Sequence, residues 1–496
     1  MGSIFSAALD RAADRLDRWF GWDRLPLPLA IVTLVGLRTR LRQQNLYDTG
    51  KGREAEQPPG DPVEYLGTRT LNGTFNDLND PLMGALHARF GRNVPLRFTY
   101  PEPPEALLEP NPRLVSRRLL TRDEFQPATT LNLLAGAWIQ FEVHDWFSHG
   151  QGEEETPWEL ALEDGDPWHE NPMRIKRAKR DPHPDASGPP TYITEDSHWW
   201  DGSQIYGMDP RFAQGIRTGE HGKLKLDAQG LPPPEIEQQV DLAGVAGNFW
   251  IGLALLHSLF MREHNAICDR LREKYPDLDD EALYQKARLV NAALMAKIHT
   301  VDWTPAVIAH PTTVVALRAN WWGILGERFV KRFGRLTSNE VLRGIPGSTT
   351  DHHTAPYSLT EEFVAVYRMH PLIPDDITFR ALGDDRVLQE RTLREVGALD
   401  VRARLDEMTM TDVFYSFGRS HPGAITLHNY PRFLQHFKRP NGEEVDLAAT
   451  DVLRTRERGV PRYNQFRRLF HLKPVESFRE LTDNPEWAEE LEEVYG

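Results

Sequence analysis

Apolar residues recur at helical spacing through the middle of the chain. In residues 243–274 they are separated by three or four positions, which is the spacing of one helix face. The positions that would share this face include Leu253, Leu256, Phe260 and His264. Further helices are predicted over residues 128–149, 278–301, 312–334 and 358–371. Strand-like alternation is scarce, so the predicted fold class is mostly α, with little β.

Two long stretches lack this periodicity. Residues 44–127 are rich in Pro, Asn, Asp and Gly, which predicts extended loops with short helices. Residues 150–196 are polar, with an acidic run at Glu153–Glu155 and a basic stretch at Arg174–Arg180. We interpret the second stretch as a long loop on the solvated surface, because alternating charge runs of this kind are typical of exposed segments.

The N-terminal residues 1–43 have a pattern of their own. Residues 4–20 predict an amphipathic helix, whose apolar face consists of Phe5, Leu9, Ala12, Leu16 and Phe20. The apolar run 25–37 is interrupted by prolines and is shorter than the about 20 residues that a membrane-spanning helix needs. We expect this segment either to pack against the remaining domain, residues 44–496, or to make a peripheral membrane contact. Charged residues precede the apolar run, which disfavours a signal peptide. The single cysteine fits a reducing compartment, so we expect a cytoplasmic location.

Composition narrows the choice of partners and metal ligands. The 496 residues include 58 Lys and Arg against 73 Asp and Glu, a net charge of −15, which argues against nucleic acid as the main partner. Cys268 is the single cysteine, so no intrachain disulfide and no cysteine-rich metal site can form. A metal would have to be bound through histidines, oxygen ligands or a cofactor.

A histidine and a glutamine lie one turn apart in the predicted helix 128–149. Gln140 and His144 are four residues apart in WIQFEVHDWF, so they would share a helix face. Two polar groups at this spacing can contact one small ligand, such as O2 or peroxide on a metal. The alternative is a core histidine whose hydrogen bonds are satisfied within the protein.

A tyrosine and a histidine have a similar relation in FVAVYRMHPLIPD. Tyr367 and His370 are three residues apart and would also share a helix face, with Pro371 and Pro374 marking the helix end. A neutral histidine is a common axial ligand of haem. A tyrosine one turn away could lose an electron and a proton to an oxidised haem, although this spacing alone is a weak signal.

The segment SHWWDGSQIYG offers oxygen atoms at every second residue. They come from the side chains of Ser197, Asp201 and Ser203 and from the carbonyl of Trp199. Ca²⁺ prefers six to eight oxygen ligands that include carboxylates. Asp145, next to His144, could supply a second carboxylate, so a calcium site is one interpretation of this pattern.

Together these motifs resemble those of the animal haem peroxidases. HDW, S-x-W-x-D-x-S, REHN, YRMH and RERGVPRYNQFRR follow one another in this order over residues 130–470. A tyrosine three residues before the histidine is similar to the cyclooxygenase and α-dioxygenase branch, and IHTVDWT and NYPRF are similar to the fatty-acid α-dioxygenases. The resemblance implies a helical fold in which haem lies between distal and proximal helices.

The resemblance also implies roles for individual residues. His370 is similar to the proximal ligand of haem b, His144 to the distal histidine and Gln140 to its companion. Tyr367 is similar to the catalytic tyrosine that forms a radical. The positions that match calcium ligands are Asp145, Ser197, Trp199, Asp201 and Ser203. The positions that match the holders of a fatty-acid carboxylate are His299 and Thr304.

The activity implied by the resemblance is the oxygenation of a fatty acid at its α-carbon. With a peroxide as activator, the tyrosyl radical would remove a hydrogen from Cα, and O2 would add there to give a 2-hydroperoxy acid. Relatives continue well beyond the position of Gly496, with C-terminal helices and an arginine that also holds the carboxylate. We therefore expect residues 44–496 to form a catalytic domain without those helices.

Two alternative functions stay open at this point. One is a haem peroxidase that oxidises small reductants, which would oxidise phenols and consume no O2 with fatty acids. The other is a non-catalytic relative that is stabilised by haem or calcium. The presence of Gln140, His144, Tyr367 and His370 together argues against the second, because a scaffold has no chemical need for all four.

Overall fold

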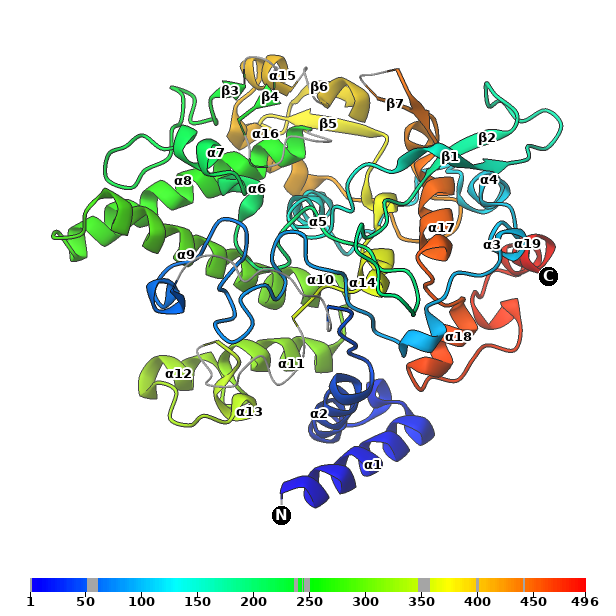
Figure 1. Cartoon of the computed structure of the whole chain (residues 1–496). Coiled ribbons are helices and arrows are strands. Elements are labelled where there is room, and N and C mark those ends of the chain that lie inside the picture. Colours follow the sequence, from blue (N-terminus) through cyan, green and yellow to red (C-terminus); the bar gives the residue numbers. More distant parts are fainter. Residues whose placement is uncertain are drawn as a thin grey trace. The chain divides into compact units, whose positions relative to one another are not determined.

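The computed structural model describes residues 2–50, 61–235, 240–242, 244, 250–346, 357–397, 401–439 and 442–496. They form two units along the chain, coloured by sequence in Figure 1. The smaller unit contains residues 1–48 and 292–357, and the larger contains 49–291 and 358–496. Helices predominate in both, and every sheet within the described residues has only two strands. The predicted mostly α fold class is confirmed.

The two long helices of the middle of the chain form where the apolar spacing predicts them. They are α8 (Ile251–Lys274) and α9 (Asp280–Ile298). Helix α8 begins later than the predicted residue 243, and residues 243 and 245–249 lie outside the described residues. The predicted apolar face of α8 is buried at Leu253, Leu256, Phe260 and His264. The shorter helix α5 (Leu134–Val143) packs on α8, where the rings of Phe141 and Phe260 stack at 5.5 Å.

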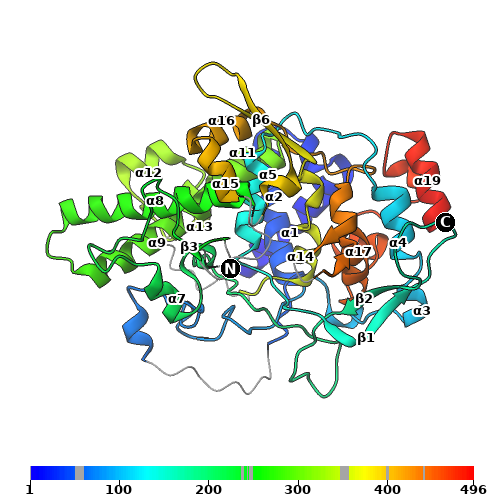
Figure 2. The same ribbon diagram turned by 90° about the horizontal axis from the view of Figure 1, so that it is seen from above.

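Helix α5 occupies the middle of the larger unit. In Figures 1 and 2 it lies between α8 on one side and α14 (Glu361–Val366) and α17 (Leu447–Glu457) on the other. It is shorter than the predicted range 128–149. Before it, the backbone N–H of Ala128 donates to Pro422 and that of Leu133 donates to Phe417, so these residues bond across the fold instead of within a helix.

The predicted helix 358–371 is interrupted, which corrects the expected shared face of Tyr367 and His370. Helix α14 ends at Val366 with Tyr367 as its C-cap, and a separate 3-10 helix covers His370–Leu372. Pro371 has no N–H to donate to the carbonyl of Tyr367, four residues before it, and its ring would clash there, so α14 cannot continue through this segment. The two side chains therefore belong to different elements.

Part of the expected polar loop 150–196 is a β-hairpin, so that prediction was wrong. Strands β1 (Glu153–Leu160) and β2 (Met173–Arg177) pair antiparallel, with Trp158 opposite Ile175. The buried residues of both strands pack with Leu453 of α17. The register shifts within β1, so the alternation that marks a strand extends over only a few residues.

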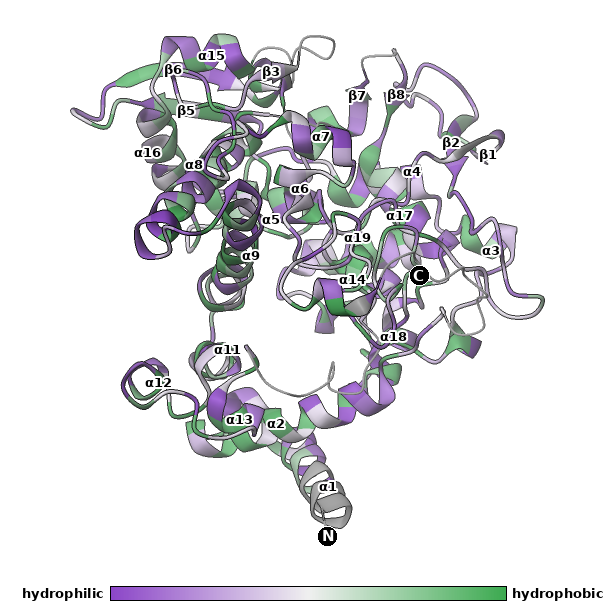
Figure 3. Ribbon diagram, turned by 60° about the vertical axis from the view of Figure 1, so that its left-hand side comes forward, coloured by the Kyte–Doolittle hydropathy of each residue, from purple (hydrophilic) through white to green (hydrophobic). Residues whose placement is uncertain are grey.

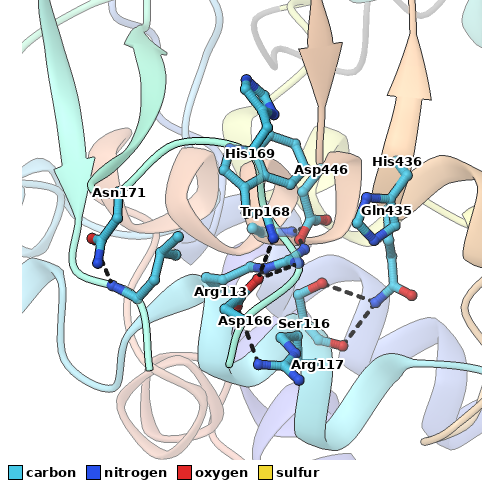
Figure 4. A network of polar contacts seen from close by, with 12 residues as sticks. Arg113, Ser116, Arg117, Asp166, Trp168, His169, Asn171, Gln435, His436 and Asp446 are labelled. Carbon is cyan, nitrogen blue, oxygen red and sulfur yellow. Dashed lines mark hydrogen bonds and ion pairs between the residues drawn. The ribbon is translucent and has the colours of Figure 1, made fainter. Parts of the chain in front are cut away.

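An arginine connects this hairpin to α17 (Figure 4). Arg113, in the short helix α4 (Pro112–Val115), donates to both carboxylate oxygens of Asp166 in the hairpin loop at 3.1 and 2.9 Å. It also donates to Asp446 at 2.7 Å. Asp446 caps the N-terminus of α17 by accepting from the backbone of Ala449. The network therefore fixes the start of the helix that contributes to the site below.

The smaller unit combines the N-terminal helices with a distant segment. Helices α1 (Gly2–Phe20) and α2 (Leu27–Gln44) belong with α11 (Pro311–Trp322), α12 (Glu327–Phe333) and α13 (Glu340–Arg343). Arg38 of α2 donates to Glu340 of α13 at 3.0 Å. Figure 3 shows hydrophobic and hydrophilic segments alternating along α2 and α11. Among the described helices, none has the length and hydropathy needed to cross a bilayer.

Candidate active site

The end of α5 brings Gln140 and His144 together. His144 is the C-cap of α5, and its backbone N–H donates to the carbonyl of Gln140 at 3.1 Å. The side-chain Nε2 atoms of the two residues are 3.4 Å apart. The spacing of four residues therefore places both side chains on one face, as the sequence predicts.

His144 differs from the core histidines of the neighbouring helix α8. Both ring nitrogens of His257 and of His264 have hydrogen-bond partners, whereas the buried Nδ1 of His144 has none among the described residues. Burial, with a smaller contribution from His257, lowers the pKa of His144 to about 4. His144 is therefore neutral at pH 7 and can accept a proton, which fits a role toward a ligand better than a role in the core.

His370 is held from behind by a carboxylate. Its Nδ1 is 2.7 Å from Asp451 Oδ2, and the same carboxylate accepts from Arg368 at 2.8 Å and from the Tyr430 hydroxyl at 3.2 Å. Burial raises the pKa of Asp451, but the charges of His370 and Arg368 outweigh it and the pKa is lowered. Within the described chain, Nε2 of His370 makes no hydrogen bond, so its lone pair can coordinate a metal.

Sequence reasoning missed this group of supporting residues. Asp451 lies in α17, 81 positions beyond His370, and no local spacing connects the two. Its closest signal is its place just before the RERGVPRYNQFRR motif, which the order of motifs already singled out. Arg368 lies inside the YRMH motif but carried no expectation of its own.

Tyr367 is half-buried at the end of α14. Its ring stacks on Phe363 at a centroid distance of 4.0 Å, with 27° between the planes. Burial raises the pKa of its phenol, so the hydroxyl keeps its proton at neutral pH. Because its phenol keeps the O–H bond, Tyr367, three residues before His370, can lose a hydrogen atom in a redox step.

The predicted calcium ligands contain oxygens without partners. Asp145 Oδ1 and Ser203 Oγ are buried and lack hydrogen-bond partners among the described residues. Ser197 Oγ donates to Asp201 Oδ2 at 2.6 Å, and the Trp199 carbonyl accepts from the backbone of Asp201. Burial, followed by repulsion from Asp201, raises the pKa of Asp145 well above its usual value. A cation would relieve both effects.

Asp201 also has protein partners. It accepts from Arg69 at 2.9 Å and from the amide of Asn76 at 3.0 Å. In the part of the chain that the structure describes, no three histidine, cysteine or acidic side chains converge in a way that could hold a metal ion. Any cation here would therefore depend on hydroxyl and carbonyl oxygens in addition to the two carboxylates.

The two predicted carboxylate-binding residues lie in the smaller unit. His299 opens a π-helical turn, His299–Trp303, and its ring stacks on Trp303 at 4.8 Å. Burial lowers the pKa of His299 to about 4. The Thr304 hydroxyl donates to the His299 carbonyl at 2.7 Å, which ties the two residues together within this unit.

Comparison with known proteins identifies the family of the chain. The family model described as "Animal haem peroxidase" matches residues 68–496. "Alpha-dioxygenase PIOX" of Oryza sativa subsp. japonica is 36% identical over 504 residues, which covers 96% of this chain and 78% of that protein. A crystal structure of fatty acid alpha-dioxygenase from Arabidopsis thaliana has a TM-score of 0.90 at 34% identity, covering 99% of this chain and 78% of that one. A variant of the Oryza sativa fatty acid alpha-dioxygenase, crystallised with palmitic acid, has a TM-score of 0.89 at 33% identity, covering 100% and 82%.

Proposed function

Because the chain belongs to the animal haem peroxidase family, we propose that it is a haem-dependent fatty-acid α-dioxygenase. The relatives with this name match nearly the whole chain, and one of them was crystallised with palmitic acid. The observation in the structure that carries the proposal is the anchored His370. Its Nδ1 is bonded to Asp451 and its Nε2 is left for a metal, three residues after Tyr367.

The residues present fit haem b. Donation from Nδ1 of His370 to a carboxylate fixes the tautomer in which Nε2 carries a lone pair, which is what an iron ligand needs. We assign His370 as this ligand, and His144 with Gln140 to the distal side. Bound haem supplies, with peroxide, the oxidising equivalent that converts Tyr367 to a radical.

The remaining steps belong to residues of the chain. Neutral His144 accepts the proton of the peroxide. The Tyr367 radical takes a hydrogen atom from Cα of the fatty acid, which breaks the C–H bond and restores the phenol O–H. O2 adds to the carbon radical. The resulting peroxyl radical takes a hydrogen atom back from Tyr367, which yields the 2-hydroperoxy acid and restores the tyrosyl radical.

Regiochemistry in this scheme depends on the carboxylate end of the substrate. We assign its binding to His299 and Thr304. A carboxylate next to His299 favours the protonated imidazole and opposes the effect of burial on its pKa. Fixing the carboxylate limits which carbon of the acid can react, and this is how positioning would select Cα.

We also assign a calcium ion to Asp145, Ser197, Trp199, Asp201 and Ser203. The support is the two buried oxygens without partners among the described residues and the rise of the Asp145 pKa, which burial and then repulsion from Asp201 cause. Asp145 directly follows His144 in the sequence. An ion bound there would restrain the end of α5 and with it the distal histidine.

A peripheral membrane contact completes the proposal. Large apolar side chains are exposed around the link between α1 and α2, with Trp19 at 75% and Phe20 at 55% exposure. Leu29 and Val32 of α2 are also exposed. An apolar surface of this kind suits the lipid–water interface, where a fatty-acid substrate is found.

Measurement of O2 uptake with palmitate tests the proposed function. We expect the haem-loaded protein to consume O2 and to form the 2-hydroperoxy acid. Tyr367→Phe should keep haem and its spectrum but lose O2 uptake. The control is Tyr415→Phe, which removes a hydroxyl that donates to Asp385 and should leave O2 uptake unchanged. Normal uptake by Tyr367→Phe would contradict the radical role, and phenol oxidation without O2 uptake would identify a peroxidase instead.

A further inference from the structure

Gln140 has a second contact besides His144. Trp250 directly precedes α8, and its indole Nε1 donates to Oε1 of Gln140 at 2.7 Å. The other end of the same amide, Nε2, lies 3.4 Å from Nε2 of His144. The amide of Gln140 therefore lies between an indole and an imidazole that are 106 positions apart in the sequence.

The hydrogen-bonding capacities of Trp250, Gln140 and His144 determine which group donates and which accepts at each contact. An indole N–H can only donate, so the amide must present its oxygen to Trp250 and its NH2 group to His144. An NH2 group also only donates, so Nε2 of His144 is the acceptor. A neutral imidazole that accepts at Nε2 carries its proton on Nδ1. The reversed amide would set two donors against each other at Trp250.

The indole itself is held firmly. Trp250 is 5% exposed, and its ring lies 5.7 Å from that of Phe417, at an angle of 30°. Its backbone forms an isolated antiparallel bridge with Gly397. A Cβ atom at Gly252 would come within 2.5 Å of the indole ring, so the absence of a side chain at this position gives the ring its room.

We propose that Trp250 is a positioning residue that sets the tautomer of the distal His144 through Gln140. In this tautomer the Nε2 lone pair of His144 is ready to accept a proton from a distal ligand. A separation of 3.4 Å is long for a hydrogen bond between nitrogens, so an incoming proton donor can displace the amide. The inference rests on the proposed haem function.

Cyanide binding to the ferric haem protein tests the inference, because hydrogen cyanide gives its proton to the distal base when it binds. Trp250→Phe should keep the haem content and weaken cyanide binding about tenfold, the effect of about one hydrogen bond. Gly252→Ala should also weaken cyanide binding, because the added Cβ displaces the indole of Trp250. Alanine favours the helix more than glycine does, so this loss would not come from a weaker helix. The matched control is Trp158→Phe, since this buried indole has no hydrogen-bond partner in the described chain and should leave cyanide affinity unchanged.

A double-mutant cycle separates a path through Gln140 from a general structural effect. In a Gln140→Ala background, Trp250→Phe should cause no further loss of cyanide affinity. A further loss there, or unchanged affinity in both Trp250→Phe and Gly252→Ala, would overturn the inference alone. A wild-type protein that takes up no haem, or no cyanide once loaded, would overturn the proposed function together with the inference.

Discussion

Asp451 places a negative charge directly behind the imidazole of His370. The carboxylate is ionised at neutral pH, because its contacts with His370 and Arg368 lower its pKa despite burial. A charged acceptor at 2.7 Å draws the Nδ1 proton toward itself and makes Nε2 a stronger donor to iron. A stronger donor stabilises the ferric state, so this residue should control the reduction potential of bound haem.

We expect Asp451→Asn to raise the haem midpoint potential. The amide still accepts a hydrogen bond but loses the charge, a difference of about 1 kcal/mol, or roughly 40 mV for a one-electron couple. Spectroelectrochemical titration of the haem-loaded protein measures this shift. Asp384→Asn, an exposed carboxylate next to Arg386, is the control and should leave the potential unchanged. An equal potential in Asp451→Asn and the wild type would contradict the argument.

Single residues of the site were predictable where the contact is local. Gln140 and His144 meet because residues four apart share a helix face, so their spacing in the sequence predicts the contact. Asp451 and Trp250 are different, because their contacts join distant segments. The packing of α17 brings Asp451 to His370, and that of α8 brings Trp250 to Gln140. No pattern within one segment carries this information, so only the structure identifies them.

Arg113 has the corresponding role for the elements around the site, since it joins α4, the β1–β2 hairpin and α17 (Figure 4). The exposed fraction of the side chain is 3% for Arg113, 3% for Asp166 and 0% for Asp446. Arg113→Ala should lower the free energy of unfolding of the larger unit by about 3–5 kcal/mol, because it leaves the buried Asp446 without its cationic partner and leaves Asp166 only Arg117. A lower midpoint in urea would report this loss.

The matched control for Arg113 is Arg118→Ala. Arg118 pairs with Glu163 at 2.9 Å, but both side chains are about half exposed, at 51% and 47%. Exposed ion pairs contribute little, so this variant should shift stability by less than about 1 kcal/mol. Similar midpoints for the two variants would show that burial does not decide the strength of these pairs.

At the scale of elements, periodicity predicted the long helices and missed the short or interrupted ones. Helices α8 and α9 have several turns of regular apolar spacing, and their ranges follow from it. The β1–β2 hairpin has a shifted register, which shortens its alternating pattern. The break between Tyr367 and His370 has a signal in Pro371, because a proline disturbs the helix as far back as the residue four positions before it, which is Tyr367.

The whole molecule has an uneven distribution of charge that no local pattern reveals. Residues 1–48 and 292–357 contain 14 Lys and Arg against 9 Asp and Glu, a net charge of +5. The remaining residues contain 44 against 64, a net charge of −20. The sequence gives the total of −15, but only contacts such as Arg38 with Glu340, 302 residues apart, show which segments form the basic unit.

A basic unit that exposes apolar side chains should bind anionic bilayers in preference to neutral ones. We expect the protein to sediment with phosphatidylserine vesicles more than with phosphatidylcholine vesicles, and less at high salt, because screening weakens attraction to the lipid charge. Trp19→Ala with Phe20→Ala should weaken binding about tenfold through lost apolar burial. Tyr463→Ala removes a ring that is as exposed as that of Phe20 from the acidic unit and should have no effect. Equal binding to both vesicle types, independent of salt, would mean that this charge distribution does not direct the protein to a membrane, and the substrate would have to reach His299 from solution.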